Sequence, residues 1–131
     1  MYFQVIMPVG NDPLKKEKEG IIRGAAKDLT PRFPRYSSQD PVFNLQASLA
    51  DLRGAEFVIA DVSLERPSCY YELGLAEALG RPVYLVAQEG TNIHQMADRR
   101  ATRFFRDLTQ FREIIEEIIH RALRSGVRPK T

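Results

Sequence analysis

Two short apolar runs with a helical pattern between them are the feature that most limits the fold of this chain. The runs FVIADV at 57–62 and VYLVA at 83–87 are apolar except for one aspartate, as strands are when both faces of their sheet are covered. Between them, residues 68–79 have helical spacing, with Gly80 and Pro82 placed where a helix ends. Because strands that alternate with helices pair in parallel through crossovers, this segment predicts a parallel sheet.

The rest of the chain continues the alternation. We expect strands at 2–9 and 103–105, helices at 15–29, 44–52 and 111–123, and a loop at 30–41 that holds a short strand at 35–37. Gly54 stands where a C-cap glycine would end the second of these helices. The pattern predicts one flavodoxin-like, doubly wound α/β domain over 1–125, with a mainly parallel sheet of about five strands and helices on both faces. A loose tail is expected at 126–131.

Composition and charge narrow the class of protein. A length of 131 residues suits one domain, and 44% hydrophobic with 27% charged residues is typical of a globular protein with a core. A net charge of +2 is too small to indicate nucleic-acid binding. The chain has no apolar run of membrane-spanning length, no signal-peptide pattern and a single cysteine, so we expect a cytoplasmic protein without a disulfide.

The residues that commonly hold metals and cofactors are scarce. One cysteine, Cys69, and two histidines, His94 and His120, are too few for a structural zinc site, and their separation does not favour a Cys–His catalytic pair. Neither GxGxxG nor GxxxxGK[ST] occurs, so the dinucleotide-binding fingerprint and the P-loop are missing from the sequence. We expect no bound metal and no cofactor.

Polar residues and glycine follow three of the apolar runs, at 7–12, 61–69 and 88–92. The carboxyl ends of parallel strands meet at one edge of the sheet, and ligands of open α/β sheets bind there. The sequence therefore predicts a small-molecule pocket at this edge, without identifying its ligand.

Two carboxylates belong to this region. Glu72 lies in the first turns of the helix that is expected to begin near Ser68, where an acid complements the helix dipole and needs no further role. Glu72 is also expected at the crevice, next to Tyr70 and Tyr71, where a carboxylate suits a nucleophile or charge stabiliser. We favour this second role. Asp61 ends a buried strand, and the capping of a turn and a role in the site are equally consistent with that position.

Three polar residues between these acids are further candidates. Ser63 and Ser68 suit contacts with a phosphate or a sugar hydroxyl, although an N-cap role is the simpler interpretation for Ser68. Arg66 suits a bidentate contact with phosphate, although loop arginines are commonly solvated.

The string ADVSLERPSCYYELGLAEALGRPVYLV at 60–86 resembles the core of the nucleoside 2-deoxyribosyltransferase-like superfamily. In that group a strand ending in Asp is followed by a loop, a Glu-Leu-Gly-x-Ala helix and a Gly-(Lys/Arg)-Pro-Val strand. The opening YFQVIMPVG at 2–10 is similar to the first strand and pocket loop of many bacterial members. The segment from Ser68 to Leu73 also resembles the glutamate region of TIR domains that cleave NAD.

The resemblance implies cleavage of an N-glycosidic bond in a nucleoside, nucleotide or NAD-like ligand. Glu72 takes the place of the family's glutamate, which attacks or stabilises the anomeric carbon, as in retaining glycosidases. Asp61 would act beside it. The expected substrate contacts are Met7, Pro8, Gly10, Ser63, Arg66, Ser68 and Tyr71. Family members often complete the pocket from a neighbouring subunit, so we expect a homodimer or higher homo-oligomer, formed through the last helix and the Tyr70–Tyr71 pair.

The sequence departs from the family pattern at two places. Arg66, Pro67, Tyr70 and Tyr71 are bulkier than the residues that precede the glutamate in the group's nucleotide hydrolases, which argues against their monophosphate pocket. The acid expected on the preceding helix is not identified, because Asn44 and Gln46 lie in that neighbourhood. A non-catalytic nucleotide-sensing module and a TIR-like association domain are the alternatives to an enzyme.

Overall fold

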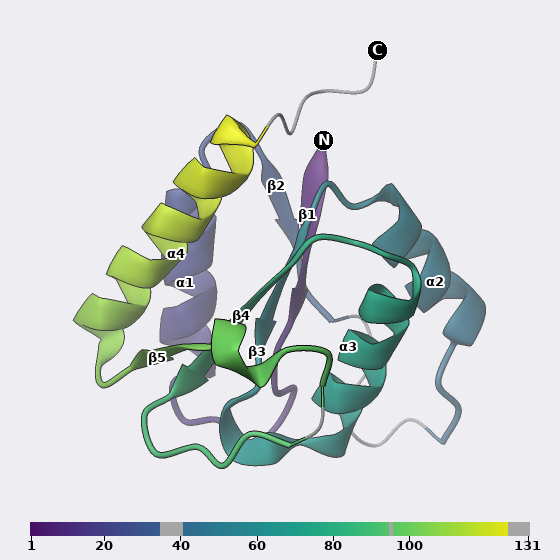
Figure 1. The fold of residues 1–131 in the computed structure, drawn as a ribbon, viewed down its shortest axis with the longest axis horizontal. Helices are drawn as coiled ribbons and strands as arrows, with labels where there is room; N and C mark the ends of the chain where they lie inside the picture. The colour runs from purple at the N-terminus through teal and green to yellow at the C-terminus, as the bar shows by residue number, and fades with distance from the viewer. Residues whose placement is uncertain (35–40, 95, 126–131) are drawn as a thin grey trace.

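The computed structural model describes residues 1–34, 41–94 and 96–125. At its centre is a parallel five-stranded sheet in the order β2-β1-β3-β4-β5 (Figure 1). The strands are β1 (Tyr2–Ile6), β2 (Thr30–Arg32), β3 (Val58–Asp61), β4 (Val83–Gln88) and β5 (Arg103–Phe105). This strand order is that of flavodoxin-like folds, so the predicted fold class is confirmed.

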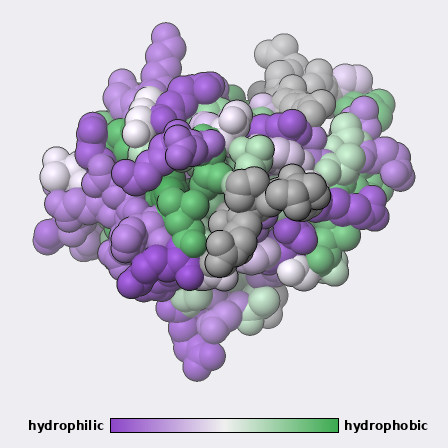
Figure 2. Space-filling view, turned by 90° about the horizontal axis from the view of Figure 1, so that it is seen from above, coloured by the Kyte–Doolittle hydropathy of each residue, from purple (hydrophilic) through white to green (hydrophobic). Residues whose placement is uncertain are grey.

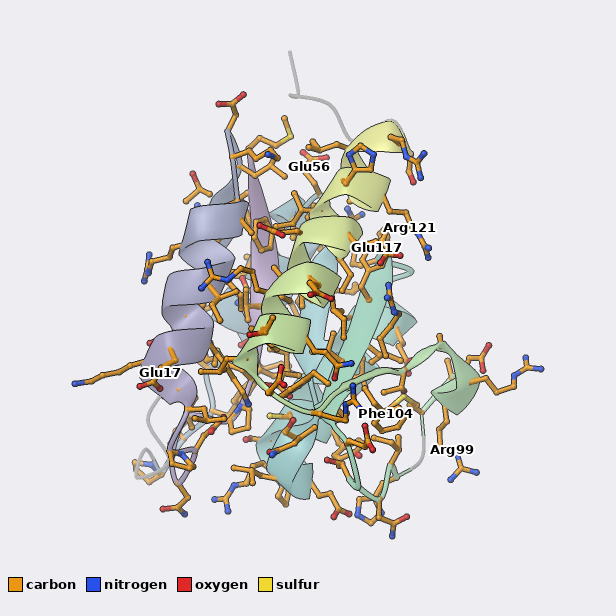
Figure 3. All side chains as sticks on the ribbon, turned by 90° about the vertical axis from the view of Figure 1, so that its left-hand side faces the viewer. Glu17, Glu56, Arg99, Phe104, Glu117 and Arg121 are labelled. Carbon is orange, nitrogen blue, oxygen red and sulfur yellow. The ribbon has the colours of Figure 1, made fainter. Side chains whose placement is uncertain are left out.

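Within the described residues, four helices cover the two faces of the sheet. Helices α1 (Lys15–Ala25) and α4 (Leu108–Arg124) lie side by side on one face, as Figure 3 shows. Helices α2 (Leu45–Gly54) and α3 (Pro67–Ala78) cover the other face (Figure 1). Two short 3-10 helices, η1 (Ser63–Glu65) and η2 (Arg99–Ala101), follow β3 and precede β5.

The core has two layers because residues alternate between the two faces along each strand. In β1 and the residue after it, Phe3, Val5 and Met7 pack in the cluster under α1 and α4. Ile6 packs in the cluster under α2 and α3. Gln4 therefore points to the same side as Ile6, toward α2 and α3, although it is polar.

Several element boundaries differ from the prediction. The loop expected at 30–41 begins with β2, and this strand tolerates Pro31 because it is at the edge of the sheet. The strand expected at 35–37 lies outside the described residues. Helix α1 ends at Ala25, four residues early, and the chain turns at Lys27, which has a φ of 57°. Helix α4 begins three residues early because the Asp107 side chain caps it by accepting from the Gln110 N–H.

Gly54 does not cap α2 as predicted. It is the last residue of the helix, and the C-cap is Ala55 in extended conformation. A Cβ on Gly54 would lie 2.5 Å from the Tyr2 hydroxyl oxygen, so this glycine makes room for a side chain of β1. Gly80, by contrast, has a φ of +69° and follows α3, as a terminating glycine should.

The apolar stripe of α4 is buried within the same chain. Phe111, Ile115 and Ile119 are at most 1% exposed, so they are not available to a partner. Of the surfaces expected to form a dimer, Tyr71 remains exposed, at 52%.

The end of the molecule where the strands begin is mainly hydrophilic, with a narrow apolar strip (Figure 2). None of the described helices is long and apolar enough to cross a membrane.

Candidate active site

A pocket of about 250 Å³ lies on the α2/α3 side of the sheet. Its polar lining comes from β1, from α2 and its N-cap, and from α3: Gln4, Asn44, Ser48, Asp51 and Glu72. Its apolar lining is Pro34, Val42, Phe43, Ala47 and Leu52. The pocket therefore combines two carboxylates with amide, hydroxyl and apolar groups.

Glu72 lines this pocket and is 4% exposed. The chain reaches it through a tight turn, with positive φ at Leu64 and Glu65, and α3 then begins at Pro67. Proline suits the first helical position because its missing N–H would have no partner there. The N-cap is Arg66, without a side-chain cap, so the N-cap interpretation of Ser68 was wrong.

Asp51 is the second carboxylate of the pocket, and it lies on α2, the helix on which the family resemblance led us to expect an acid. It is 8% exposed, and its carboxylate lies 3.5 Å from the Arg32 guanidinium. The Tyr2 hydroxyl donates to its backbone carbonyl at 2.6 Å, and Arg32 stacks 3.7 Å over the Tyr2 ring. The sequence does contain a pattern that indicates Asp51, because Asn44, Ser48 and Asp51 are spaced so that they lie on one helix face.

Gln4 is a further residue that the sequence analysis did not single out. It is 3% exposed, and its Nε2 donates to the Val5 carbonyl at 3.5 Å. Its Oε1 has no hydrogen-bond partner among residues 1–34, 41–94 and 96–125. A polar residue inside an apolar strand was the signal in the sequence.

Asp61 does not line the pocket. Its carboxylate accepts from Lys18 Nζ at 2.8 Å and from the Ser63 N–H at 3.0 Å. Lys18 Nζ also lies 2.8 Å from the Asp12 carboxylate, and the three side chains are at most 4% exposed. Burial alone would lower the pKa of Lys18, but the charges and hydrogen bonds of the two aspartates outweigh it and raise that pKa.

The three polar segments after the strands do meet, as predicted. Lys18 joins the segment after β1 to the end of β3, and the Ser63 hydroxyl accepts from the Gln88 N–H at 2.7 Å. Ser63 is 1% exposed, so this bond is internal to the fold.

The other residues expected to contact substrate are not part of the lining of this pocket. Met7 and Pro8 are buried, and Met7 packs under α1 and α4. Gly10, Arg66 and Ser68 are partly exposed and are not part of the pocket lining. The Tyr71 ring meets Phe43, which lines the pocket, edge to face at 5.1 Å.

Cys69 lies one helical turn before Glu72 and is fully buried. Burial, followed by the carboxylates of Glu72 and Asp61, raises the pKa of its thiol to about 12. The nucleophilic thiolate is therefore scarce at neutral pH, which leaves Glu72 as the stronger candidate. No group of three or more His, Cys, Asp or Glu residues suited to a metal occurs in the described parts of the chain.

Comparison with known proteins identifies a structural relative. The 2-deoxyribosyltransferase of the psychrotolerant bacterium Bacillus psychrosaccharolyticus, characterised as a biocatalyst for nucleoside synthesis, superposes with a TM-score of 0.61. The two chains share 20% sequence identity, and the match covers 86% of this chain and 90% of the other. No protein-family model matches the chain, and no curated protein matches it in sequence. The chain thus has a nucleoside 2-deoxyribosyltransferase-like fold.

Proposed function

We propose that this protein cleaves the N-glycosidic bond of a nucleoside, with Glu72 as nucleophile or oxocarbenium stabiliser. The observation that carries the proposal is the burial of the Glu72 carboxylate in a pocket that a second carboxylate, Asp51, also lines. Retaining glycosidases use a pair of carboxylates to cleave glycosidic bonds. The deoxyribosyltransferase-like fold supports the same class of reaction.

The Glu72 carboxylate would face the anomeric carbon of the sugar. As the C1′–N bond breaks, the electron pair of that bond leaves with the base, whose nitrogen takes up a proton from solvent water, and positive charge develops at C1′. The carboxylate either stabilises that charge or forms a C1′–O bond with it. Water then gives the free sugar, and a second base gives a new nucleoside. Asp51, held toward Arg32, is suited to accept hydrogen bonds from the sugar hydroxyls.

The dimensions of the pocket favour a nucleoside over a dinucleotide. The pocket volume of about 250 Å³ is slightly below the roughly 300 Å³ at which ligand pockets begin, so most of a dinucleotide such as NAD would lie outside it.

Base release from a panel of nucleosides, nucleotides and NAD, followed by chromatography, tests this proposal. Glu72→Gln should abolish release because the amide cannot share the positive charge at C1′. Glu113→Gln is the matched control, since Glu113 is exposed on α4, across the sheet from the pocket. Undiminished release by the Glu72→Gln protein would contradict the proposal.

A nucleotide-sensing module is the second candidate. The observation in its favour is that Asp61, expected to act beside Glu72, is held by Lys18 and the Ser63 N–H instead. A sensor would bind a ligand tightly without releasing base.

Homodimer formation also stays a prediction, which sedimentation equilibrium of the purified chain would test.

A further inference from the structure

Gln4 occupies a position where the fold itself favours an apolar side chain. It lies in β1, an interior strand of the sheet, between Phe3 and Val5, which are 0% exposed. It points to the face where Ile6 packs in the core under α2 and α3. Burial of an amide without full hydrogen bonding destabilises a protein, so a buried glutamine with an unmatched oxygen calls for another explanation.

The amide of Gln4 is poorly satisfied by the protein. Its Nε2 donates to the adjacent Val5 carbonyl at 3.5 Å, the outer limit of a hydrogen bond. Its Oε1 accepts no bond from the described residues, although it is buried. The side chain also lines the pocket that contains Glu72. An acceptor without a partner is thus present at the wall of a ligand-sized cavity.

We infer that Gln4 recognises the base of the bound nucleoside, with Oε1 accepting an N–H from an exocyclic amino group. The adjacent ring nitrogen of adenine or cytosine can accept from Nε2, the pairing by which glutamine binds adenine edges. The ligand class rests on the proposed function, since it takes the pocket to be a nucleoside site. The inference adds a specificity-determining residue and a base class, those with an amino group beside a ring nitrogen.

The distribution of polar groups favours the base over the sugar as the partner of Gln4. A sugar carries hydroxyls in several directions and suits the polar groups of α2 and α3, which are Asn44, Ser48, Asp51 and Glu72. A base has two apolar faces and a polar edge. Gln4 on the strand, with apolar groups such as Leu52 and Phe43 around the same cavity, suits that edge.

Binding measurements separate this inference from the reaction. In the Glu72→Gln protein, which should not turn over, calorimetry would compare adenosine with purine riboside, which lacks the 6-amino group, and cytidine with its analogue lacking the 4-amino group. We expect at least one amino-bearing nucleoside to bind about tenfold more tightly than its analogue, the effect of one hydrogen bond. Adding Gln4→Met should abolish that preference without lowering the melting temperature, because it removes an unsatisfied amide.

Ser48→Ala in the same Glu72→Gln protein is the control, because it alters another polar group of the pocket. It should weaken both members of a pair equally. The inference would be overturned if the Glu72→Gln protein, with Gln4 intact, bound both members of each pair with equal affinity. It would also be overturned if that protein bound none of the amino-bearing nucleosides. A preference that survives Gln4→Met would overturn it too. A Gln4-dependent preference without base release by the wild-type protein would instead refute the proposed reaction and leave the inference intact.

Discussion

Lys18 Nζ lies 2.8 Å from Asp61 Oδ2, although 43 residues separate the two in sequence. The same nitrogen lies 2.8 Å from Asp12, and the Phe105 and Phe111 rings lie 5.3 and 6.0 Å from it. Helix α1 is thereby joined to the segment that follows β1 and to the end of β3. The carboxylates that frame the carboxyl edge of the sheet are therefore held by the fold itself.

Lys18→Met should lower the free energy of unfolding by about 3–5 kcal/mol, because it leaves two buried carboxylates without their cation. Urea denaturation would measure the loss. Lys15→Met is the control, since Lys15 forms a partly exposed pair with Glu19 at 3.7 Å and should change stability by at most about 0.5 kcal/mol. Equal stability of the two variants would show that the buried ion pairs of Lys18 do not contribute to the free energy of unfolding.

The raised pKa of Lys18 gives stability a dependence on alkaline pH. The charged lysine contributes fully below its ordinary pKa of 10.5, and the contribution is lost as pH rises through the higher folded-state value. The unfolding free energy of the wild-type protein should therefore fall above about pH 10.5. The difference in unfolding free energy between the wild-type and Lys18→Met proteins, measured by denaturation at increasing pH, should therefore become smaller. A constant difference would contradict the prediction.

The sequence predicted those features that depend on local pattern. Apolar runs and helical spacing located β3, α3, β4 and β5, and placed Glu72 near the start of a helix that lines the pocket. The pairing of distant side chains could not be predicted, because nothing local shows that Lys18 reaches Asp61. For the same reason Asp51, rather than Asp61, shares the pocket with Glu72. The role of Gly54 was misinterpreted because the residue that it contacts, Tyr2, lies in β1, far from it in the sequence.

Gly54→Ala should destabilise the protein by about 1–3 kcal/mol, since the new Cβ would meet the Tyr2 hydroxyl oxygen at 2.5 Å. Tyr2→Phe alone should cost about 1 kcal/mol through loss of the 2.6 Å bond to the Asp51 carbonyl. Because Tyr2→Phe also removes the obstructing oxygen, the double variant should be more stable than the sum of the two losses implies. Thermal denaturation of all four proteins completes the cycle, and strict additivity would argue against the contact.

Cys69 should not react with a thiol reagent such as DTNB at pH 8 in the folded protein. Its thiol is fully buried, and burial with the Glu72 and Asp61 carboxylates raises its pKa to about 12. One thiol per chain should react on addition of guanidinium chloride. Rapid reaction without denaturant would show that α3 opens readily or that the thiol is not in this environment.

Asp51→Asn and Asp61→Asn should separate a residue of the site from a residue of the framework. Asp51 lines the pocket, so Asp51→Asn should lower kcat/KM for base release by about 10- to 100-fold, the effect of weakening the hydrogen bonds of a charged group to the sugar. Asp61 holds Lys18 outside the pocket lining, so Asp61→Asn should instead lower the unfolding free energy by about 3 kcal/mol, with a smaller effect on kcat/KM at temperatures where the variant is folded. Parallel kinetic and denaturation measurements would distinguish the two effects. Loss of activity at unchanged stability in the Asp61→Asn protein would return Asp61 to the catalytic role that its position at the end of β3 first suggested.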